Sequence, residues 1–113
     1  MSEAQLSSTL DLAGEIAALK QENTWAQSDR VARTLVKRDR LQLVLTMLKA
    51  DARLHEHHAE GRVTVQTITG HLRLQIDGQS IDLPAGHVVV IEPGVLHDVQ
   101  AVEESAFLLT IAA

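Results

Sequence analysis

The sequence predicts an all-β fold, an antiparallel sandwich or barrel, preceded by a short helix or arm. From residue 31 onward apolar and polar residues alternate with a period of two, the spacing of strands that bury one face. Turn residues divide this region into short runs at intervals of roughly ten residues, and no helical pattern interrupts them. Aromatic residues make up only 2% of the chain, so the core must be built from Leu, Val and Ile.

The first 30 residues follow a different pattern. Leu12, Ile16 and Leu19 fall at i, i+4 and i+7, the spacing of one helical face. Asp11 precedes them and can cap a helix. We therefore expect a short amphipathic helix over about residues 11–22, within an arm (residues 1–30) that lies on the barrel (residues 31–113) or on a partner subunit.

The expected strands follow one another along the barrel region. The first apolar stripe is made of Leu41, Leu43, Leu45 and Met47. We interpret it as core or dimer interface. Asp77-Gly78 is a strong tight-turn signal, and both prolines stand at strand boundaries, as a sheet requires. Further strands are expected at 62–69, 72–76, 80–83, 87–91, 97–102 and 106–111, which gives roughly eight strands in all.

The composition excludes several classes of function. The chain has 113 residues, the length of one domain, and no cysteine, which excludes disulfides and favours a reducing cytoplasm. A net charge of −5 disfavours nucleic acid as the partner. No apolar run is long enough to cross a membrane, and the first residues lack the features of a signal peptide. A basic cluster is interpreted as the solvated face and turn of a strand pair: Arg30, Arg33, Lys37, Arg38 and Arg40.

Histidines concentrate in the stretch LHEHHAEG, residues 54–61. Residues i and i+2 of a strand point to one face, so His55 and His57 are expected to aim together. His97 opens a later strand and can bring a third imidazole to the same point. Three neutral imidazoles suit zinc, and iron, copper and nickel are compatible. His58 replaces His55 in an alternative set if an extra residue forms a bulge. A solvent-facing polar segment is the other interpretation.

Three more residues are candidates for a pocket around these histidines. Glu60 is the nearest acid, and Gln66 offers a carbonyl oxygen. Glu92 is interpreted either as a general base beside a ligand or as a carboxylate at a sheet edge. No residue can be assigned a catalytic role, and motifs of nucleophilic or nucleotide-binding enzymes are absent from the sequence.

Residues 86–97, GHVVVIEPGVLH, are similar to the second conserved motif of the cupin superfamily. That motif runs glycine, five residues, proline, any residue, glycine, two residues, histidine. Gly86, Gly94 and His97 fall in register with it. Glu92 occupies the position of the proline, and Pro93 follows one place later.

Residues 55–70 resemble the first cupin motif, which is a His-any-His pair followed by a carboxylate and a glycine. His55 and His57 match the pair, and Gly70 matches the glycine. The carboxylate position falls near Arg62 or Val63, so the carboxylate is lost.

The resemblance implies a double-stranded β-helix, a small jelly-roll barrel of the RmlC-like cupin type. It implies a divalent transition metal (zinc, iron, nickel or manganese) held by His55, His57 and His97, with a small organic ligand in the barrel. A metal-dependent dioxygenase or isomerase would fit such a site. The alternative is a metal-free small-molecule-binding, structural or regulatory cupin without catalysis, because the fold says little about the reaction. We also expect a homodimer, since the outer sheet faces of a small aliphatic barrel need cover.

Overall fold

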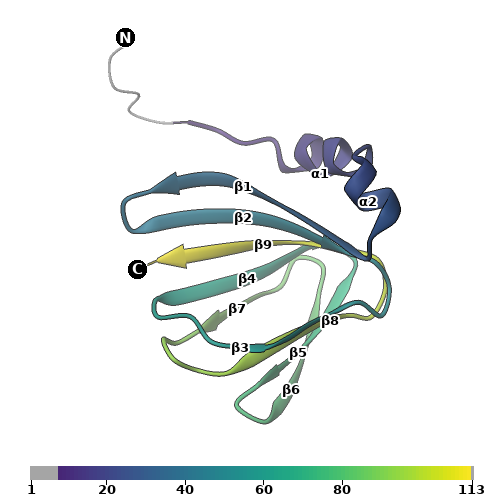
Figure 1. The fold of residues 1–113 in the computed structure, drawn as a ribbon. Coiled ribbons are helices and arrows are strands. Elements are labelled where there is room, and N and C mark those ends of the chain that lie inside the picture. Colours follow the sequence, from purple (N-terminus) through teal and green to yellow (C-terminus); the bar gives the residue numbers. More distant parts are fainter. Residues whose placement is uncertain (1–7, 113) are drawn as a thin grey trace.

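The computed structural model describes residues 8–112, apart from the side chain of His57. Within that range two short helices, α1 (Leu12–Lys20) and α2 (Asn23–Gln27), precede nine strands (Figure 1). The strands are β1 (Arg30–Arg38), β2 (Leu41–Leu48), β3 (Arg53–His57), β4 (Arg62–Thr69), β5 (His71–Ile76), β6 (Gln79–Pro84), β7 (Val88–Ile91), β8 (His97–Ala101) and β9 (Ser105–Ala112). Roughly eight strands were expected from the sequence. The strand β3 was not among those expected, because it is short and rich in histidine and so shows no alternation of apolar residues.

The strands form two antiparallel sheets that enclose one core. The five-stranded sheet has the order β1-β2-β9-β4-β7, and the four-stranded sheet has the order β3-β8-β5-β6. The β5–β6 hairpin turns at Asp77 and Gly78, both with positive φ, as the Asp-Gly signal predicts. The predicted all-β jelly-roll fold is confirmed.

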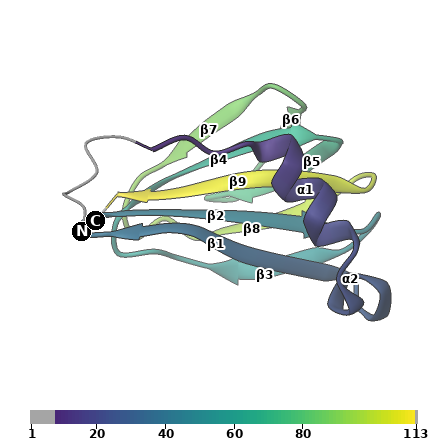
Figure 2. The same cartoon turned by 90° about the horizontal axis from the view of Figure 1, so that it is seen from above.

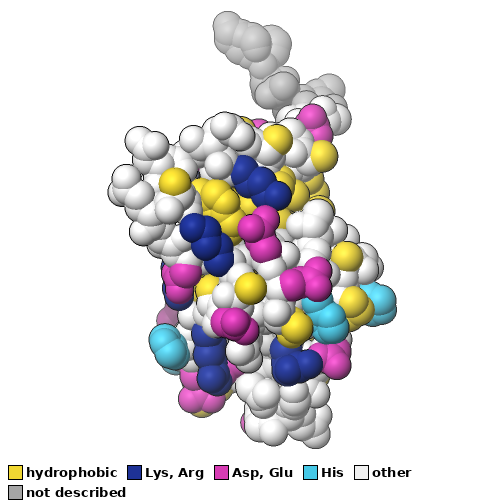
Figure 3. All heavy atoms as spheres, turned by 90° about the vertical axis from the view of Figure 1, so that its right-hand side faces the viewer, with side chains coloured by type: hydrophobic (Ala, Val, Ile, Leu, Met, Phe, Trp, Pro, Cys, Tyr) yellow, Lys and Arg dark blue, Asp and Glu magenta, His cyan; other side chains and the backbone are white. Residues whose placement is uncertain are grey.

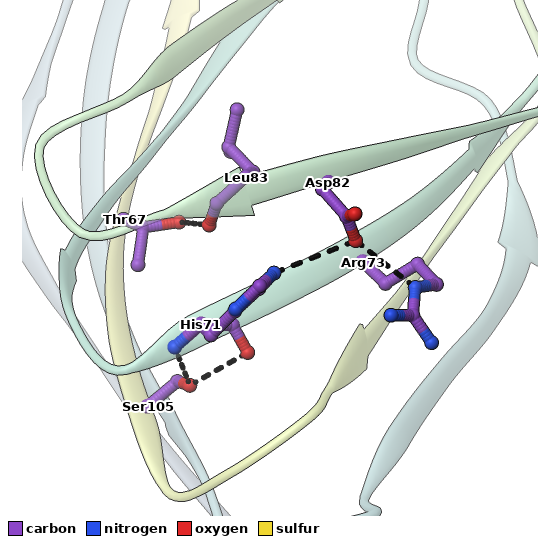
Figure 4. Close-up of polar contacts among 6 residues, drawn as sticks. All are labelled: Thr67, His71, Arg73, Asp82, Leu83 and Ser105. Carbon is purple, nitrogen blue, oxygen red and sulfur yellow. Dashed lines mark hydrogen bonds and ion pairs between the residues drawn. The ribbon is translucent and has the colours of Figure 1, made fainter.

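The core between the sheets is aliphatic with one aromatic ring. Phe107 of β9 lies among Val and Leu side chains from both sheets, and Leu72 and Leu74 of β5 are completely buried. Thr67 is also completely buried, and its hydroxyl donates a hydrogen bond of 2.8 Å to the carbonyl of Leu83. This bond links β4 to β6, so it joins the two sheets across the interior (Figure 4).

The helices lie on the outer face of the five-stranded sheet. Seen from the side α1 lies above this sheet, and seen from above it crosses β9 and β2 (Figures 1 and 2). The expected helix is confirmed: Asp11 caps it by accepting a hydrogen bond of 3.1 Å from the N–H of Gly14. Ile16 and Leu19 face inward, and the second helix, α2, adds Trp25. These residues share a second buried cluster with Val31, Leu45, Met47 and Ala106 of the sheet.

Charged residues tie the helices to the sheet at one end of the molecule. Arg33 of β1 donates a hydrogen bond of 3.1 Å to Glu15 of α1 and also pairs with Glu22, which precedes α2. Lys20 of α1 pairs at 3.1 Å with Glu104. Figure 3 shows this end of the molecule, where basic and acidic side chains lie beside a gathering of hydrophobic ones. Neither described helix has the length and apolar character of a membrane span.

Candidate metal centre

His57 and His97 come from strands far apart in sequence, and the fold makes them direct neighbours. The backbone register of β3 and β8 pairs these two residues across the antiparallel ladder. The same register pairs Leu54 with Val99, and both of these contribute to the core between the sheets. The meeting of two imidazole-bearing positions from two distant segments, which the sequence predicts, is therefore present at the level of the backbone.

A β-bulge lies between Leu54 and His57. The register shifts there, because three steps along β3 match two steps along β8. The extra residue interrupts the simple alternation from which a shared face for His55 and His57 was expected. His55 is exposed, and so is His58, which follows the strand. The choice between these two as a third ligand therefore stays open.

The His97 imidazole is buried inside the end of the barrel. The residue is 3% exposed, and its Nδ1 lies 3.0 Å from the carbonyl oxygen of Val95. A backbone carbonyl at that distance favours the tautomer with hydrogen on Nδ1, which leaves the lone pair on Nε2. Metal-binding histidines are commonly oriented by such a bond.

Two loops hydrogen-bonded to each other close this end of the barrel. The N–H of Gly94, in the loop between β7 and β8, donates to the carbonyl of Ala59, in the loop between β3 and β4, at 2.9 Å. The N–H of Asp77 donates to the carbonyl of Leu96 at 3.1 Å, which joins the β5–β6 turn to the same loop. These two hydrogen bonds therefore join three loops around the backbone of His57 and His97.

The remaining predicted pocket residues lie outside this enclosed region. Glu60 is exposed in the β3–β4 loop. Glu92 is also exposed, and its carboxylate accepts a hydrogen bond of 2.8 Å from Nε of Arg62, which supports its interpretation as an edge carboxylate. Gln66 lies on the outer face of β4, because Val63, Val65 and Thr67 take the inner one.

The family's carboxylate position is filled by groups that cannot replace it. Val63 points into the core with 3% exposure, and Arg62 is exposed. Among the side chains that the structure describes, a set without that of His57, no group of three or more His, Asp or Glu is arranged to hold a metal ion. The described part of the chain also contains no detectable pocket. The register of β3 with β8 thus brings two histidine positions together, and the family's carboxylate is missing from the sequence beside them.

A polar network that the sequence analysis did not anticipate covers the outer face of the four-stranded sheet. Asp98 of β8 is 5% exposed and accepts a hydrogen bond of 2.5 Å from Arg53 of β3 and one of 3.3 Å from the N–H of Gln75. Nearby on the same face, Asp82 accepts a hydrogen bond of 3.0 Å from Arg73. In the sequence, Arg73 alternates with Leu72 and Leu74, which marks it as an outward residue, but alternation does not say which charged residue it meets.

His71 extends this network at its other end (Figure 4). The ring atom Nε2 of His71 is buried and lies 3.4 Å from Oδ1 of Asp82. The backbone N–H of His71 donates a hydrogen bond of 2.9 Å to the hydroxyl of Ser105. The hydrogen bond from Arg73 holds the pKa of Asp82 below its usual value of 3.8, and His71 adds to this effect. His71 is the first residue of β5 and is half-buried.

Comparisons with known proteins agree with this architecture. The family model described as "Cupin domain" matches residues 44–112. A conserved protein of unknown function from Streptococcus pyogenes is 23% identical, with 98% of this chain and 91% of that chain covered and a TM-score of 0.73. A cupin-2 domain containing protein from Shewanella frigidimarina is 19% identical, with 92% and 94% covered and a TM-score of 0.73.

A third solved structure is the Cupin_2 domain of an XRE family transcriptional regulator from Enterobacter cloacae. It is 21% identical, with 76% of this chain and 98% of that chain covered and a TM-score of 0.68. No curated protein is detectably similar to the chain. At these identities the structures demonstrate the fold alone. The family model spans well over half of the chain, and the two motifs lie on β3, β4, β7 and β8 as the fold requires, so this protein belongs to the cupin domain family.

Proposed function

We propose that this protein binds a divalent transition metal at the end of its barrel through His57 and His97, with His55 or His58 as a third ligand. The single observation that carries the proposal is the direct register of His57 with His97. Residues opposite each other on antiparallel strands have Cβ atoms about 4.5–5.5 Å apart, a separation that one shared ion can bridge. The buried setting of His97 and its bond to Val95 add support.

The donor set favours metals that accept neutral imidazole. Zinc, iron and nickel suit such ligands, whereas manganese prefers oxygen donors. Because the family's carboxylate is missing here, the proposed site offers few oxygen donors. When bound, the metal would polarise a ligand oxygen or activate water. The chain's own residues would hold these ligands: the β3–β8 ladder sets the spacing of the backbone at residues 57 and 97, and the Val95 carbonyl orients the His97 imidazole.

A small organic ligand would bind at the same end of the barrel, beside the loops that carry Ala59 and Gly94. Turnover of the dioxygenase or isomerase type would require such a ligand next to the metal. The absence of cysteine supports a reducing compartment such as the cytoplasm.

The competing function is a metal-free binding or regulatory cupin. Two observations favour it: Val63 and Arg62 stand at the family's carboxylate position, and a pocket is lacking among the described residues. The similar Cupin_2 domain from Enterobacter cloacae belongs to an XRE family transcriptional regulator, so a regulatory role is the second function that we consider.

Metal content separates these functions. We expect close to one first-row metal ion per chain after supplementation with zinc, iron, nickel and manganese, measured by mass spectrometry of the purified protein. His57→Ala combined with His97→Ala should remove the metal. His87→Ala is the matched control, because His87 is exposed and outside the proposed set. His55→Ala and His58→Ala, tested separately, identify the third ligand. A wild-type protein that stays substoichiometric in metal would reject the proposal in favour of the metal-free function.

We further propose that the protein is a homodimer. Large apolar side chains remain exposed on the barrel, among them Leu41, Val88 and Val90, at 40%, 55% and 54% exposure. Val88 and Val90 lie on the same face of β7, and exposed apolar side chains that gather on one face commonly mark an interface. Light scattering at micromolar concentration should give twice the mass of one chain, and a monomer mass would contradict the proposal.

A further inference from the structure

The tip of the β1–β2 hairpin carries three exposed cations, Lys37, Arg38 and Arg40. The turn of this hairpin lies at the same end of the molecule as the loops that follow β3 and β7 (Figure 1). We call this end, which holds His57 and His97, the histidine end. Within residues 8–112 no acid pairs with these three cations. The other lysines and arginines each have an acid or, for Lys49, the ring of Trp25 as partner: Lys20, Arg30, Arg33, Arg53, Arg62 and Arg73.

Lys37 lies on the inner face of its sheet. The register places it opposite Gln42 of β2, and Gln42 opposite Ile111 of β9. Ile111 packs against the core between the sheets. Residues directly opposite each other on antiparallel strands share a face, so Lys37 and Gln42 both face inward. Arg38, one residue further along the strand, faces outward.

A β-bulge in β1 is what turns Lys37 inward. Arg33 lies on the outer face, where it donates a hydrogen bond of 3.1 Å to Glu15 of α1. Strict alternation from Arg33 would place Lys37 on that outer face as well. The register shift between Thr34 and Val36 adds one residue to β1 and exchanges the faces beyond it. Bulges are frequent next to functional sites, where they re-aim a side chain.

Two hydrogen bonds between the sheets establish which strands face each other. Arg30 of β1 donates a bond of 3.0 Å to the carbonyl of Arg53 of β3. Thr67 of β4 donates one of 2.8 Å to the carbonyl of Leu83 of β6. The strand orders β1-β2-β9-β4 and β3-β8-β5-β6 therefore run alongside each other, and seen from above β1 lies over β3 and β2 over β8 (Figure 2). The β1–β2 hairpin thus lies opposite the two strands of the proposed metal centre.

The two sheets also match in height along the barrel. The bond from Thr67 to Leu83 brings one row of each sheet to the same level. In the four-stranded sheet, His97 lies four residues from that row toward the histidine end. In the five-stranded sheet, Gln42 lies four residues from it in the same direction. Because packed sheets are about 10 Å apart, the Lys37–Gln42 pair faces the histidine row across a gap that a small molecule can span.

The inner face is progressively less covered toward β1. In the row that contains Lys37, Val63 is 3% exposed, Ile111 and Gln42 are half-buried, and Lys37 itself is exposed. The same gradient holds in the next row, from the buried Val65 to the exposed Thr34. An ammonium and an amide at this position can therefore meet a ligand that comes from water.

We propose that Lys37 and Gln42 form a subsite opposite the metal centre, and that this subsite selects a small organic acid with a second carboxylate. The inference rests on the proposed metal-binding function and names its ligand class. One carboxylate would reach the metal, and the other would accept hydrogen bonds from the Lys37 ammonium and the Gln42 amide. Of the acids at this end, Glu60 is exposed in the β3–β4 loop, and Glu92 is paired with Arg62.

The donor set matches a carboxylate better than a phosphate. A carboxylate carries one negative charge and two acceptor oxygens, which one ammonium and one amide satisfy. A phosphate group carries about −1.5 to −2 charges and three acceptor oxygens, which call for additional cations. Arg38 does not supply one, because it lies on the outer face.

Succinate and its monoamide, succinamate, test the subsite. Both offer a carboxylate to the metal, but only succinate has a second one. Isothermal titration calorimetry of zinc-supplemented protein should show succinate binding about tenfold or more tightly than succinamate, because a charge-assisted hydrogen bond is stronger than a neutral one. Lys37→Met should remove this preference, and Gln42→Leu should reduce it. Arg38→Met is the matched control: it changes the net charge equally on the same hairpin, and it should keep the preference.

Zinc content, measured on the same samples, separates this inference from the proposed function. Lys37→Met with the zinc content of the wild type but no preference for succinate supports the subsite. A zinc-containing wild type without the preference rejects the subsite and leaves the metal centre. A zinc-free wild type whose preference disappears in Lys37→Met rejects the metal centre and keeps the subsite. Equal losses in Lys37→Met and Arg38→Met would reject the subsite, because general surface charge would then explain the preference.

Discussion

The two sheets of this barrel share one core but have unlike outer faces. On the four-stranded sheet, the outer positions of β3, β8, β5 and β6 carry Arg53, Asp98, Arg73 and Asp82, joined in ion pairs. On the five-stranded sheet, the corresponding positions of β2 and β9 carry Leu, Met, Ala and Thr. There Leu45 and Met47 are sealed by the N-terminal helices, and Leu41 remains exposed.

This difference shows how one alternating pattern serves two purposes. A strand needs apolar residues only on its inner face, and a polar outer face is the ordinary result for an antiparallel sheet that meets water. Where the outer face is apolar as well, it requires cover. Part of that cover comes from α1 and α2, and the exposed remainder is the surface on which the proposed homodimer rests.

The largest expected effect concerns the covered end of the apolar face. Leu19 of α1 is completely buried against the sheet. Leu19→Ala should lower the free energy of unfolding by about 2–4 kcal/mol, because it removes buried methyl groups and leaves a cavity. Urea denaturation followed by circular dichroism measures the change. Leu10→Ala is the control at a position that is 40% exposed, and its effect should stay within about 0.5 kcal/mol. Equal effects of the two substitutions would mean that the helix adds little to stability.

The next effect concerns the polar face. The side chain of Asp98 is only 8% exposed, and its carboxylate pairs with Arg53. In the Arg53→Ala variant this carboxylate keeps the hydrogen bond from the N–H of Gln75 but loses its cationic partner. The free energy of unfolding should fall by about 1–3 kcal/mol, since a buried acceptor loses a partner. The same chemical denaturation applies. Arg53→Ala in an Asp98→Asn background should cost clearly less, and additive costs would show that the two side chains do not interact.

The smallest effect is a dependence on pH confined to the polar face. The pKa of Asp82 is lowered by Arg73 and secondarily by His71, so its ionised form is favoured in the folded state. Its contribution to stability is therefore fully present above its ordinary pKa of 3.8 and is lost as the pH falls through the lower folded value. Asp82→Asn should flatten the decline of stability below about pH 4. Carboxyl NMR titration gives the pKa directly, and a value at or above the ordinary one would reject this account.

Much of this structure could be predicted from the amino-acid pattern. Period-two alternation marks most strands, Asp77-Gly78 marks a hairpin, and the spacing of Leu12, Ile16 and Leu19 marks α1, because these signals depend on neighbours in the chain. The candidate site was less accessible. The meeting of His57 with His97 was expected from the placement of histidines on the predicted strands together with a resemblance. The bulge before His57 depends on how β3 fits β8, which a single strand does not specify.

By itself, the sequence determined that strands dominate the chain, which of their faces is apolar, and where its histidines stand. Only the tertiary structure decided that the stripe of Leu45 and Met47 turns away from the barrel core to meet α1, and that Glu92 pairs with Arg62. It also decided that Asp98 is buried beside Arg53. The physical reason is that alternation separates two faces of a strand but does not say what lies against either. Contacts between distant segments are set by sheet order and register, which arise from the packing of the whole chain.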